Sequence, residues 1–240
     1  MYIEGKNAIK QAIESNITIN KVMVDKNFQG RKDEIINLAV QKKIKFEFVP
    51  RVVLDKKSKT KHHQGYIAES VDFDYSSVED ILNVAKEKNS NSFIVLLDGI
   101  EDPHNFGAII RSCECAGVDG IIIPKNRACQ VNETVIKTST GAISNMKIAK
   151  VTNLKDAIAT LKENNIFVFG CEANGKEIYN FNFKQNIALI IGSEGFGIKK
   201  SIIEQCDDVV ALPLKGKVNS LNASVACGIC TFEVVRQRLN

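Results

Sequence analysis

Two loops near the C-terminal end of the chain combine glycines with polar side chains, and such loops can bind a ligand. The first, Gly192–Gly197, reads GSEGFG, and the second spans residues 213–222. Each follows a short apolar run typical of a buried strand, at residues 187–191 and 209–212. Glycines let the backbone approach a ligand closely, because they carry no Cβ. Ligands of open α/β sheets bind where strands end, so we predict one pocket built from both loops.

The pattern of the first loop indicates which ligands it does not bind. Its spacing is GxxGxG, whereas dinucleotide-binding loops read GxGxxG and follow the first strand of their unit. The carboxylate of Glu194 would repel a phosphate group, so the loop favours a cationic or hydrogen-bonding ligand. Alternatively, this carboxylate only complements the positive end of a helix dipole.

Four further polar residues lie at two places where a loop leads into a predicted helix. Asn105 and Arg111 are six residues apart at one such junction, and an arginine on an apolar helix faces either a site or a salt bridge. Ser220 and Asn222 precede another predicted helix, where Ser and Asn are also common N-caps. Taken singly, none of these four residues distinguishes catalysis from a structural role.

Other chemistries lack the residues that they need. No G-x-S-x-G elbow accompanies the three histidines, so a serine hydrolase is disfavoured. The seven cysteines are odd in number and no export signal precedes them, which favours free thiols. Cys227 and Cys230 form a CxxC, but both would face the core from a predicted helix, and no second CxxC completes a zinc site. We therefore predict two buried thiols and no metal.

Strands and helices alternate from residue 93 onward, which predicts an α/β domain with a mostly parallel sheet covered by helices. Predicted strands cover residues 93–97, 120–123, 146–151, 166–170, 187–191 and 209–212. Predicted helices cover residues 108–116, 131–138, 154–163 and 221–238.

The first 70 residues predict a separate, small α/β unit near the lower end of domain size. We expect helices over residues 3–14, 31–43 and 50–54, and strands over 19–24, 44–49 and 66–71. A helix over 78–88 follows, with Ser77 as its N-cap. We place the first domain at residues 1–72, a linker and connecting helix at 73–91, and the second domain at 92–240.

Basic residues are concentrated in the first unit. Residues 1–70 carry 14 lysines and arginines against 8 acids, a balance of +6, whereas the rest of the chain has a balance of −2. The loop over 56–65 is especially basic and contains Lys56, Lys57, Lys59, Lys61 and His63. This module favours binding to a polyanion such as nucleic acid, although a solvated basic face has the same composition.

Three stretches taken together resemble the motifs of the SpoU branch of the SPOUT methyltransferases. They are DPHNFGAIIR at 102–111, IGSEGFG at 191–197, and LPL followed by NSLNASVA within 212–226. All three occur in the family's order, and the resemblance covers residues 93–240. Tyr2, Gly5 and the HQG at 63–65 resemble the small ribosomal-protein-like RNA-binding domain that is fused to members of this family.

This resemblance implies a parallel sheet whose C-terminal segment forms a trefoil knot. It also implies S-adenosylmethionine as cofactor, RNA as substrate, and a homodimer with the final helix at its interface. The reaction implied is methylation of a ribose 2′-OH. The front domain favours a guanosine of 23S rRNA, because the tRNA guanosine enzymes of the family usually lack it.

Carried over by position, the resemblance also implies roles for single residues. The catalytic set is Asn105, Arg111, Glu194, Ser220 and Asn222. Cofactor binding falls to Gly192, Gly197, Leu212, Leu221 and Asn222, and binding of RNA phosphates falls to Lys56, Lys57, Lys59, Lys61 and His63. Arg111 is the family's usual candidate for the base. Because arginine normally stays protonated in proteins, a role as a clamp on an RNA phosphate is equally open.

Three other functions stay open at this point: a tRNA methyltransferase, an RNA-binding or ribosome-assembly factor with a vestigial site, and a nucleotide-dependent enzyme. The hydrophobic content of 44% is ordinary for a globular protein. No apolar run approaches the ~18 residues of a membrane helix, and the N-terminus lacks the apolar segment of a signal peptide. We therefore expect a cytoplasmic protein without a membrane partner.

Overall fold

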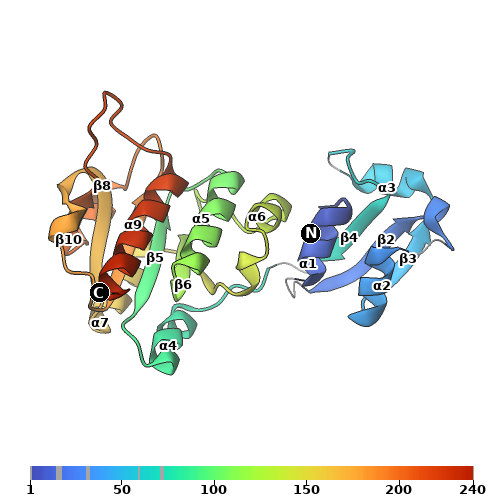
Figure 1. The fold of residues 1–240 in the computed structure, drawn as a ribbon. Coiled ribbons are helices and arrows are strands. Elements are labelled where there is room, and N and C mark those ends of the chain that lie inside the picture. Colours follow the sequence, from blue (N-terminus) through green and yellow to red (C-terminus); the bar gives the residue numbers. More distant parts are fainter. Residues whose placement is uncertain (1, 15–17, 31–32, 59, 71–72, 240) are drawn as a thin grey trace. The chain divides into compact units, whose positions relative to one another are not determined.

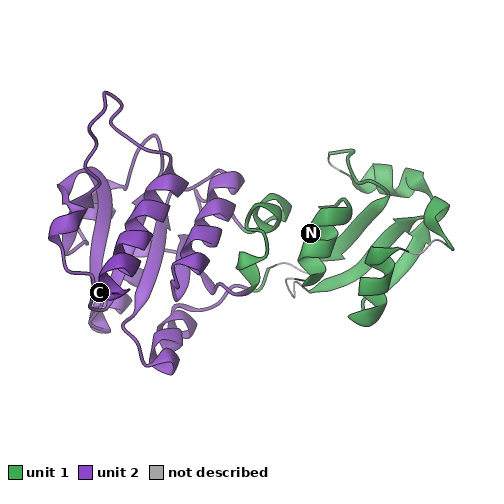
Figure 2. Ribbon diagram, viewed as in Figure 1, with its two compact units in different colours: residues 1–74, 131–144 green, residues 75–130, 145–240 purple. Residues whose placement is uncertain are grey.

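The chain forms two compact units in the computed structural model (Figure 2). Unit 1 comprises residues 1–74 and 131–144, and unit 2 comprises 75–130 and 145–240. The residues that the structure describes are 2–14, 18–30, 33–58, 60–70 and 73–239. Each unit has its own sheet, with four strands in unit 1 and six in unit 2.

Unit 2 is built on a sheet in which every neighbouring pair of strands is parallel, in the order β10-β8-β9-β5-β6-β7. The strands are β5 (Phe93–Asp98), β6 (Gly120–Pro124), β7 (Ile148–Val151), β8 (Phe167–Glu177), β9 (Ile187–Gly192) and β10 (Asp208–Ala211). Strands β5 and β9 are buried along their length, which explains their continuous apolar runs. The prediction of an α/β domain with a mostly parallel sheet is confirmed.

Helices cover both faces of this sheet. On one face, α4 (Val78–Lys88), α7 (Leu154–Glu163) and α8 (Lys200–Ile203) share a core with alternate residues of the central strands, such as Leu96 and Ile190. Two other helices, α5 (Pro103–Cys115) and α9 (Ala223–Leu239), pack against each other, and α9 also contacts β9 (Figure 1). No described helix is long and apolar enough to cross a membrane.

Local sequence signals position the helix starts. Ser77 and Asp80 form a reciprocal capping box at the start of α4, as the predicted N-cap requires. At the start of α5, Asp102 accepts a hydrogen bond from the backbone of His104 at 2.7 Å, and Pro103 occupies the first turn. This start places Asn105 in the first turn of α5, beside the end of β5.

Unit 1 has a mixed sheet in the order β1-β4-β2-β3, in which only β2 and β3 are parallel. Its strands are β1 (Tyr2–Glu4), β2 (Ile19–Asp25), β3 (Lys45–Val49) and β4 (Tyr66–Ser70). Its helices are α1 (Lys6–Glu14), α2 (Glu34–Gln41), α3 (Arg51–Lys57) and α6 (Glu133–Thr138), with short 3₁₀ turns η1 (Lys26–Phe28) and η2 (Ala142–Ser144). The predicted small α/β unit is thus present.

The segment 131–144 belongs to unit 1, although the residues before and after it belong to unit 2. Its helix α6 packs against α1 and β1. Within the same contact, Glu133 accepts a hydrogen bond from the backbone N–H of Glu4 at 2.6 Å. Val135 and Ile136 of α6 are buried.

Two elements differ from the predictions. Residues 3–14 were expected to form one helix, but β1 precedes α1, and Gly5 separates them with a φ of +88°. The strand predicted over 166–170 is longer in the structure, because β8 continues to Glu177 and pairs with β10 through a bulge. A Cβ at Gly175 would lie 2.6 Å from the backbone of Val210, so glycine permits this close approach.

One arginine ties the end of α9 to two other segments of unit 2, residues 91–92 and 183–185. The half-buried guanidinium of Arg238 donates hydrogen bonds of 2.7–3.1 Å to four backbone carbonyls. The acceptors are Asn91, Ser92, Phe183 and Gln185. Burial lowers the pKa of Arg238 below its usual value, and the guanidinium remains charged at neutral pH.

Replacing this arginine is expected to destabilise unit 2. Arg238→Ala leaves four carbonyls without their charged donor, so the free energy of unfolding should fall by about 2 kcal/mol or more. Urea denaturation followed by circular dichroism measures the change. The exposed Lys86→Ala in α4 serves as control, and an equal midpoint for both variants would contradict the prediction.

Candidate active site

Three segments of unit 2 meet at one carboxylate. Asn105 donates a hydrogen bond to Glu194 Oε1 at 2.9 Å, and the side-chain amide of Asn222 donates to the same oxygen. Asn222 also donates to Asn105 Oδ1 at 3.0 Å, which closes the triangle. The backbone N–H of Ala223 adds a longer hydrogen bond of 3.3 Å to Glu194 Oε1. The three predicted residues Asn105, Glu194 and Asn222 therefore form one hydrogen-bonded cluster.

Helix α9 fixes one side of this cluster. Asn222 Oδ1 accepts hydrogen bonds from the backbone N–H groups of Ser224 at 3.0 Å and Val225 at 3.2 Å, which makes Asn222 the N-cap. Glu194 then lies against the positive end of the helix dipole. The capping and dipole roles considered for these residues are thus real, and they coexist with the cluster.

The glycine loop presents Glu194 at the end of β9. Ser193 and Gly197 exchange two backbone hydrogen bonds of 2.9 and 3.1 Å, and the residues between them form a tight turn. A Cβ at Gly192 would lie 2.2 Å from the backbone of Gly197 and 2.4 Å from that of Ile198. Glycine is therefore required at position 192, because the backbone passes too close for any side chain.

Two carboxylates that the sequence reasoning missed hold this loop in place. Glu172 accepts a hydrogen bond from the backbone N–H of Ile198. Asp98, which is 1% exposed, accepts from the backbone of Lys199 at 2.9 Å and pairs with its ammonium group at 2.5 Å. The position of Asp98 at the end of a predicted strand was a usable signal, whereas nothing in the sequence marks Glu172.

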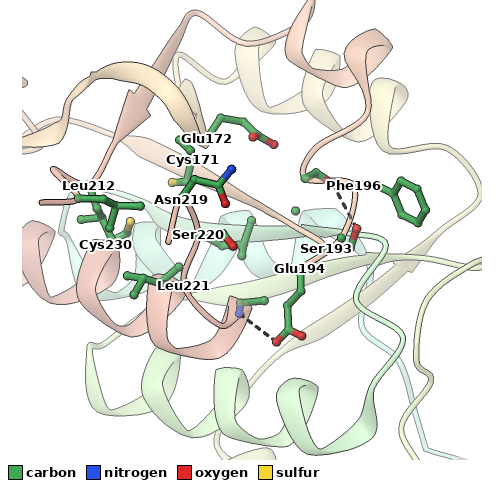
Figure 3. Close-up of a pocket in the computed structure, with 18 of the residues that line it drawn as sticks. Cys171, Glu172, Ser193, Glu194, Phe196, Leu212, Asn219, Ser220, Leu221 and Cys230 are labelled. Carbon is green, nitrogen blue, oxygen red and sulfur yellow. Dashed lines mark hydrogen bonds between the residues drawn. The ribbon is translucent and has the colours of Figure 1, made fainter. Parts of the chain in front are cut away.

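A cavity of about 340 Å³, which we call cavity A, lies between strand β8 and the loops that follow β9 and β10 (Figure 3). Predicted cofactor residues among its lining are Gly192, Gly197, Leu212 and Leu221, and the predicted catalytic residues Glu194 and Ser220 line it as well. Two carboxylates, Glu172 and Glu194, are among the described lining residues, but no lysine or arginine is. This charge suits a cationic ligand and disfavours a phosphate.

A second cavity of about 620 Å³, cavity B, lies on the other side of the glycine loop. Residues 193–197 and Ala223 line both cavities, so the glycine loop forms the wall between them. Asn105 lines cavity B, together with residues of the loop after β5. The cluster of Asn105, Glu194 and Asn222 therefore lies where two ligands would meet.

The structure does not bring Arg111 to this cluster. Arg111 lies further along α5, is exposed, and forms no hydrogen bond or ion pair with any described residue. It lines neither cavity A nor cavity B. Its side chain is available for a phosphate or for a second protein chain.

The thiols near cavity A are not poised for reaction. Cys171 and Cys230 line the cavity. The pKa of Cys171 is raised well above its usual value, mainly by a hydrogen bond with Cys230 and next by burial. Cys227 and Cys230 are buried, as predicted, and all seven cysteines are free. Within the described residues, no group of three or more His, Cys, Asp or Glu side chains could hold a metal ion.

The predicted basic loop of unit 1 begins later than expected, because Lys56 and Lys57 belong to α3, and its members differ in exposure. Lys56 and Lys61 are exposed, and neither side chain pairs with a described residue. Lys57 donates a hydrogen bond to the hydroxyl of Tyr2 at 2.6 Å. Lys59 lies outside the described residues.

His63 is only 1% exposed, so its side chain supports the structure of this loop. Its Nδ1 accepts from the backbone of Gly65 at 3.0 Å, and its Nε2 donates to Asp55 at 2.9 Å. Glu4, which the sequence reasoning missed, accepts hydrogen bonds of 2.6 Å from the hydroxyls of Ser58 and Thr60. This geometry does not favour the predicted contact of His63 with RNA; the buried ring positions the loop.

Comparisons with known proteins decide the family. The model of the SpoU rRNA Methylase family matches residues 92–232. The chain belongs to this family. A second model, described as RNA 2′-O ribose methyltransferase substrate binding, matches residues 2–76 of this SpoU family member. The resemblance deduced from the three motifs and from the front domain is therefore confirmed.

Curated relatives match the SpoU chain over nearly its whole length. The Bacillus subtilis protein named "Putative TrmH family tRNA/rRNA methyltransferase YacO" is 41% identical over 99% of this chain and 96% of its own length. A Staphylococcus aureus protein of the same TrmH family description is 40% identical over 98% of this chain and 96% of its own. These names describe methyltransferases but do not divide tRNA from rRNA substrates.

Solved structures share the fold of the SpoU chain. The SpoU methyltransferase AviRb from Streptomyces viridochromogenes, in complex with AdoMet, superposes with a TM-score of 0.84 at 22% identity, over 100% of this chain and 91% of its own. The AdoMet-bound rRNA methyltransferase from Sinorhizobium meliloti gives a TM-score of 0.74 at 20% identity, over 100% and 88%. The A. aeolicus TrmH/SpoU tRNA modifying enzyme gives 0.56 at 26% identity, over 68% and 84%.

The two glycines of the loop allow a matched test of cavity A. Gly192→Ala should weaken binding of S-adenosylmethionine about tenfold or more, because its Cβ collides with the backbone that shapes the cavity. Gly195→Ala, with nothing within 4 Å of its Cβ, should bind as the unaltered protein does. Isothermal titration calorimetry measures both affinities, and equal losses in the two variants would refute the close-approach argument.

Proposed function

We propose that this SpoU family member transfers a methyl group from S-adenosylmethionine to a ribose 2′-OH in RNA, at a guanosine of 23S rRNA. The observation that carries the proposal is the cluster of Asn105, Glu194 and Asn222 in the wall between two cavities. One cavity suits the cofactor, and the other opens toward the substrate. A methyl transfer needs its two reactants to meet at such a wall.

Cavity A has the chemistry that the cofactor requires. Its volume of about 340 Å³ lies within the range of small-molecule sites. Leu212, Leu221 and Ala226 provide apolar surface, while Gly192 leaves backbone groups accessible. The carboxylates of Glu172 and Glu194 favour a positively charged ligand. These residues of β8, of the loops after β9 and β10 and of α9 would hold S-adenosylmethionine, which supplies a methyl group on a positively charged sulfur.

The chain's own residues orient the acceptor and stabilise its charge. The side chains of Asn105 and Asn222, held by Glu194, present polar groups between the cavities, and Ser220 lines cavity A beside them. As the acceptor oxygen forms a bond to the methyl group, the S–CH3 bond breaks and the hydroxyl proton passes to solvent. Arg111 stays protonated, so we assign it to an RNA phosphate and to the negative charge that develops nearby, rather than to proton abstraction.

Unit 1 supports an rRNA substrate. The solved tRNA modifying enzyme of A. aeolicus matches 68% of this chain, whereas the S. meliloti rRNA methyltransferase matches all of it. The S. meliloti rRNA methyltransferase therefore has a counterpart of unit 1. Mapping ribose methylation in 23S rRNA and tRNA from cells with and without this protein tests the assignment. Loss of a methyl group from tRNA alone would contradict the rRNA assignment and support the tRNA alternative.

A non-catalytic RNA-binding or assembly factor is the second candidate. The intact cluster disfavours it, because a vestigial site has no need for three mutually bonded polar side chains. Binding of S-adenosylmethionine by calorimetry separates the two, since an assembly factor would show none. A nucleotide-dependent enzyme is disfavoured by the carboxylates of cavity A, which repel phosphate.

The active form is a cytoplasmic homodimer in this proposal. Helix α9 exposes Val225, Ile229 and Phe232 at helical spacing, and each is 41–48% exposed. A second copy that covers this apolar stripe would lie next to α5, because α5 packs against α9. Arg111 would then reach the partner's site. The predicted trefoil knot, formed by the C-terminal segment, is part of the same proposal.

Arg111 gives the sharpest test of the chemistry. Arg111→Ala should abolish methyl transfer while binding of S-adenosylmethionine stays nearly unchanged, because Arg111 does not line cavity A. Arg111→Lys should recover little, since a lysine cannot hold a phosphate with two parallel hydrogen bonds. A tritium-transfer assay and calorimetry measure the two properties. Unchanged transfer in Arg111→Ala would refute the assignment.

A mixed dimer tests whether Arg111 acts across the interface. Purified heterodimers of Arg111→Ala with Glu194→Ala contain one intact composite site if Arg111 acts on the partner's site, so about half of the activity should return. If Arg111 acts within its own chain, both sites are defective and the heterodimer is inactive. A monomeric protein in solution would contradict the dimer itself.

The basic loop should set the salt dependence of RNA binding. Replacing Lys56 and Lys61 with alanine should reduce the slope of log K against log salt by ~1.4, because each phosphate contact on single-stranded RNA contributes ~0.7. Lys86 and Lys155, two exposed lysines of unit 2, serve as the control pair. Equal slopes in the two double variants would count against the loop. Fluorescence anisotropy with labelled rRNA measures both.

A further inference from the structure

Phe196 stands at the tip of the glycine loop with its ring in solvent. It is 97% exposed, more than any other large apolar side chain that the structure describes. Its ring contacts no other described aromatic side chain. Figure 3 shows it pointing away from Leu212 and Leu221, which line cavity A. An aromatic ring in this position contributes nothing to the core of the unit.

The ring lies at the rim shared by the two cavities. Phe196 is among the residues that line cavity B, together with Asn105 and Glu194 of the cluster. Cavity B has a volume of about 620 Å³, which is enough for a nucleotide base. An RNA whose ribose reaches the cluster would therefore bring its base into cavity B, next to an uncovered aromatic face.

Two charged side chains of cavity B have no partner within the described part of the chain. Asp98 is paired with Lys199, and Asp102 accepts a hydrogen bond from the start of α5. Glu101 and Arg127 also line the cavity, are exposed, and form no hydrogen bond or ion pair with a described residue. One free carboxylate and one free guanidinium thus accompany the aromatic ring.

This combination matches one RNA base. Sequence-specific RNA recognition stacks a splayed base on an aromatic ring and reads its Watson–Crick and Hoogsteen edges. Guanine presents adjacent N1–H and N2–H donors to a carboxylate, and its O6 and N7 accept from a guanidinium. Adenine offers neither the pair of adjacent donors nor the O6 acceptor.

We propose that Phe196, Glu101 and Arg127 form the binding pocket for the target base, with Phe196 stacked on it and the two charged side chains selecting guanine. This inference rests on the proposed methyl transfer and adds the residues that choose the nucleotide. Phe196 lines both cavities, and in this assignment its exposed ring binds the substrate base.

Phe196→Ala tests the stacking. Loss of base stacking is worth about 1–3 kcal/mol, so kcat/KM for RNA should fall about tenfold or more, while the Kd for S-adenosylmethionine and the oligomeric state stay unchanged. Phe196→Tyr should retain most of the activity, because it keeps the aromatic face. Phe167→Ala, an exposed phenylalanine at the start of β8, is the matched control and should behave as the unaltered enzyme.

Glu101→Gln tests the selectivity. The ratio of kcat/KM for a guanosine substrate over the same RNA with adenosine at the target should fall about tenfold, because the amide cannot accept from both guanine donors. Unchanged kcat/KM in Phe196→Ala would overturn the inference, as would a loss traced to weaker cofactor binding or to a dissociated dimer. Absence of transfer by the unaltered enzyme would remove the proposed function itself, which separates the two failures.

Discussion

The carboxylate of Glu194 is the interaction on which the site depends. One of its oxygens accepts hydrogen bonds from the amides of Asn105 and Asn222 and from the backbone of Ala223. These donors come from the start of α5, from the loop after β10 and from the start of α9. A single charge thereby holds together the glycine loop, the start of α5 and the start of α9, which are far apart in sequence. It does so at the positive end of a helix, where a negative charge is favoured.

Charge also explains how one glycine loop serves two cavities. Glu172 and Asp98 fix the backbone directly after the loop, at Ile198 and Lys199. The loop is thus held by carboxylates at its base and presents a third carboxylate at its turn. Cavity A becomes negatively lined, which separates this site from phosphate-binding glycine loops that rely on bare backbone N–H groups.

Much of the fold could be read from the sequence because its signals are local. Continuous apolar runs marked the buried strands β5 and β9, and Ser77 with Asp80 marked the start of α4. The strand β1 was missed because three residues are too few for a period. The extension of β8 was missed because its glycine and asparagine resemble a turn, and only pairing with β10 makes it a strand.

The candidate site was predictable in part for a similar reason. Residues in the three motifs could be named, but their hydrogen bonds could not, since these join positions up to 117 apart in the chain. Glu172 and Glu4 carry no local mark, and their roles arise only from tertiary contacts. His63 was misread because a basic neighbourhood says nothing about burial, whereas the ring is enclosed and both its nitrogens are occupied.

The grouping of residues 131–144 with unit 1 alters how the protein can be dissected. The polypeptide passes between the units three times, after residues 74, 130 and 144. Two domains that follow each other in sequence would have a single crossing. A truncation near residue 73 would strip α6 of the surface formed by α1 and β1, and would expose Val135 and Ile136. The excised C-terminal fragment would then expose an apolar patch that the intact protein buries. Low stability of this fragment would result from the position of the cut. It would not show whether the methyltransferase domain requires the RNA-binding domain.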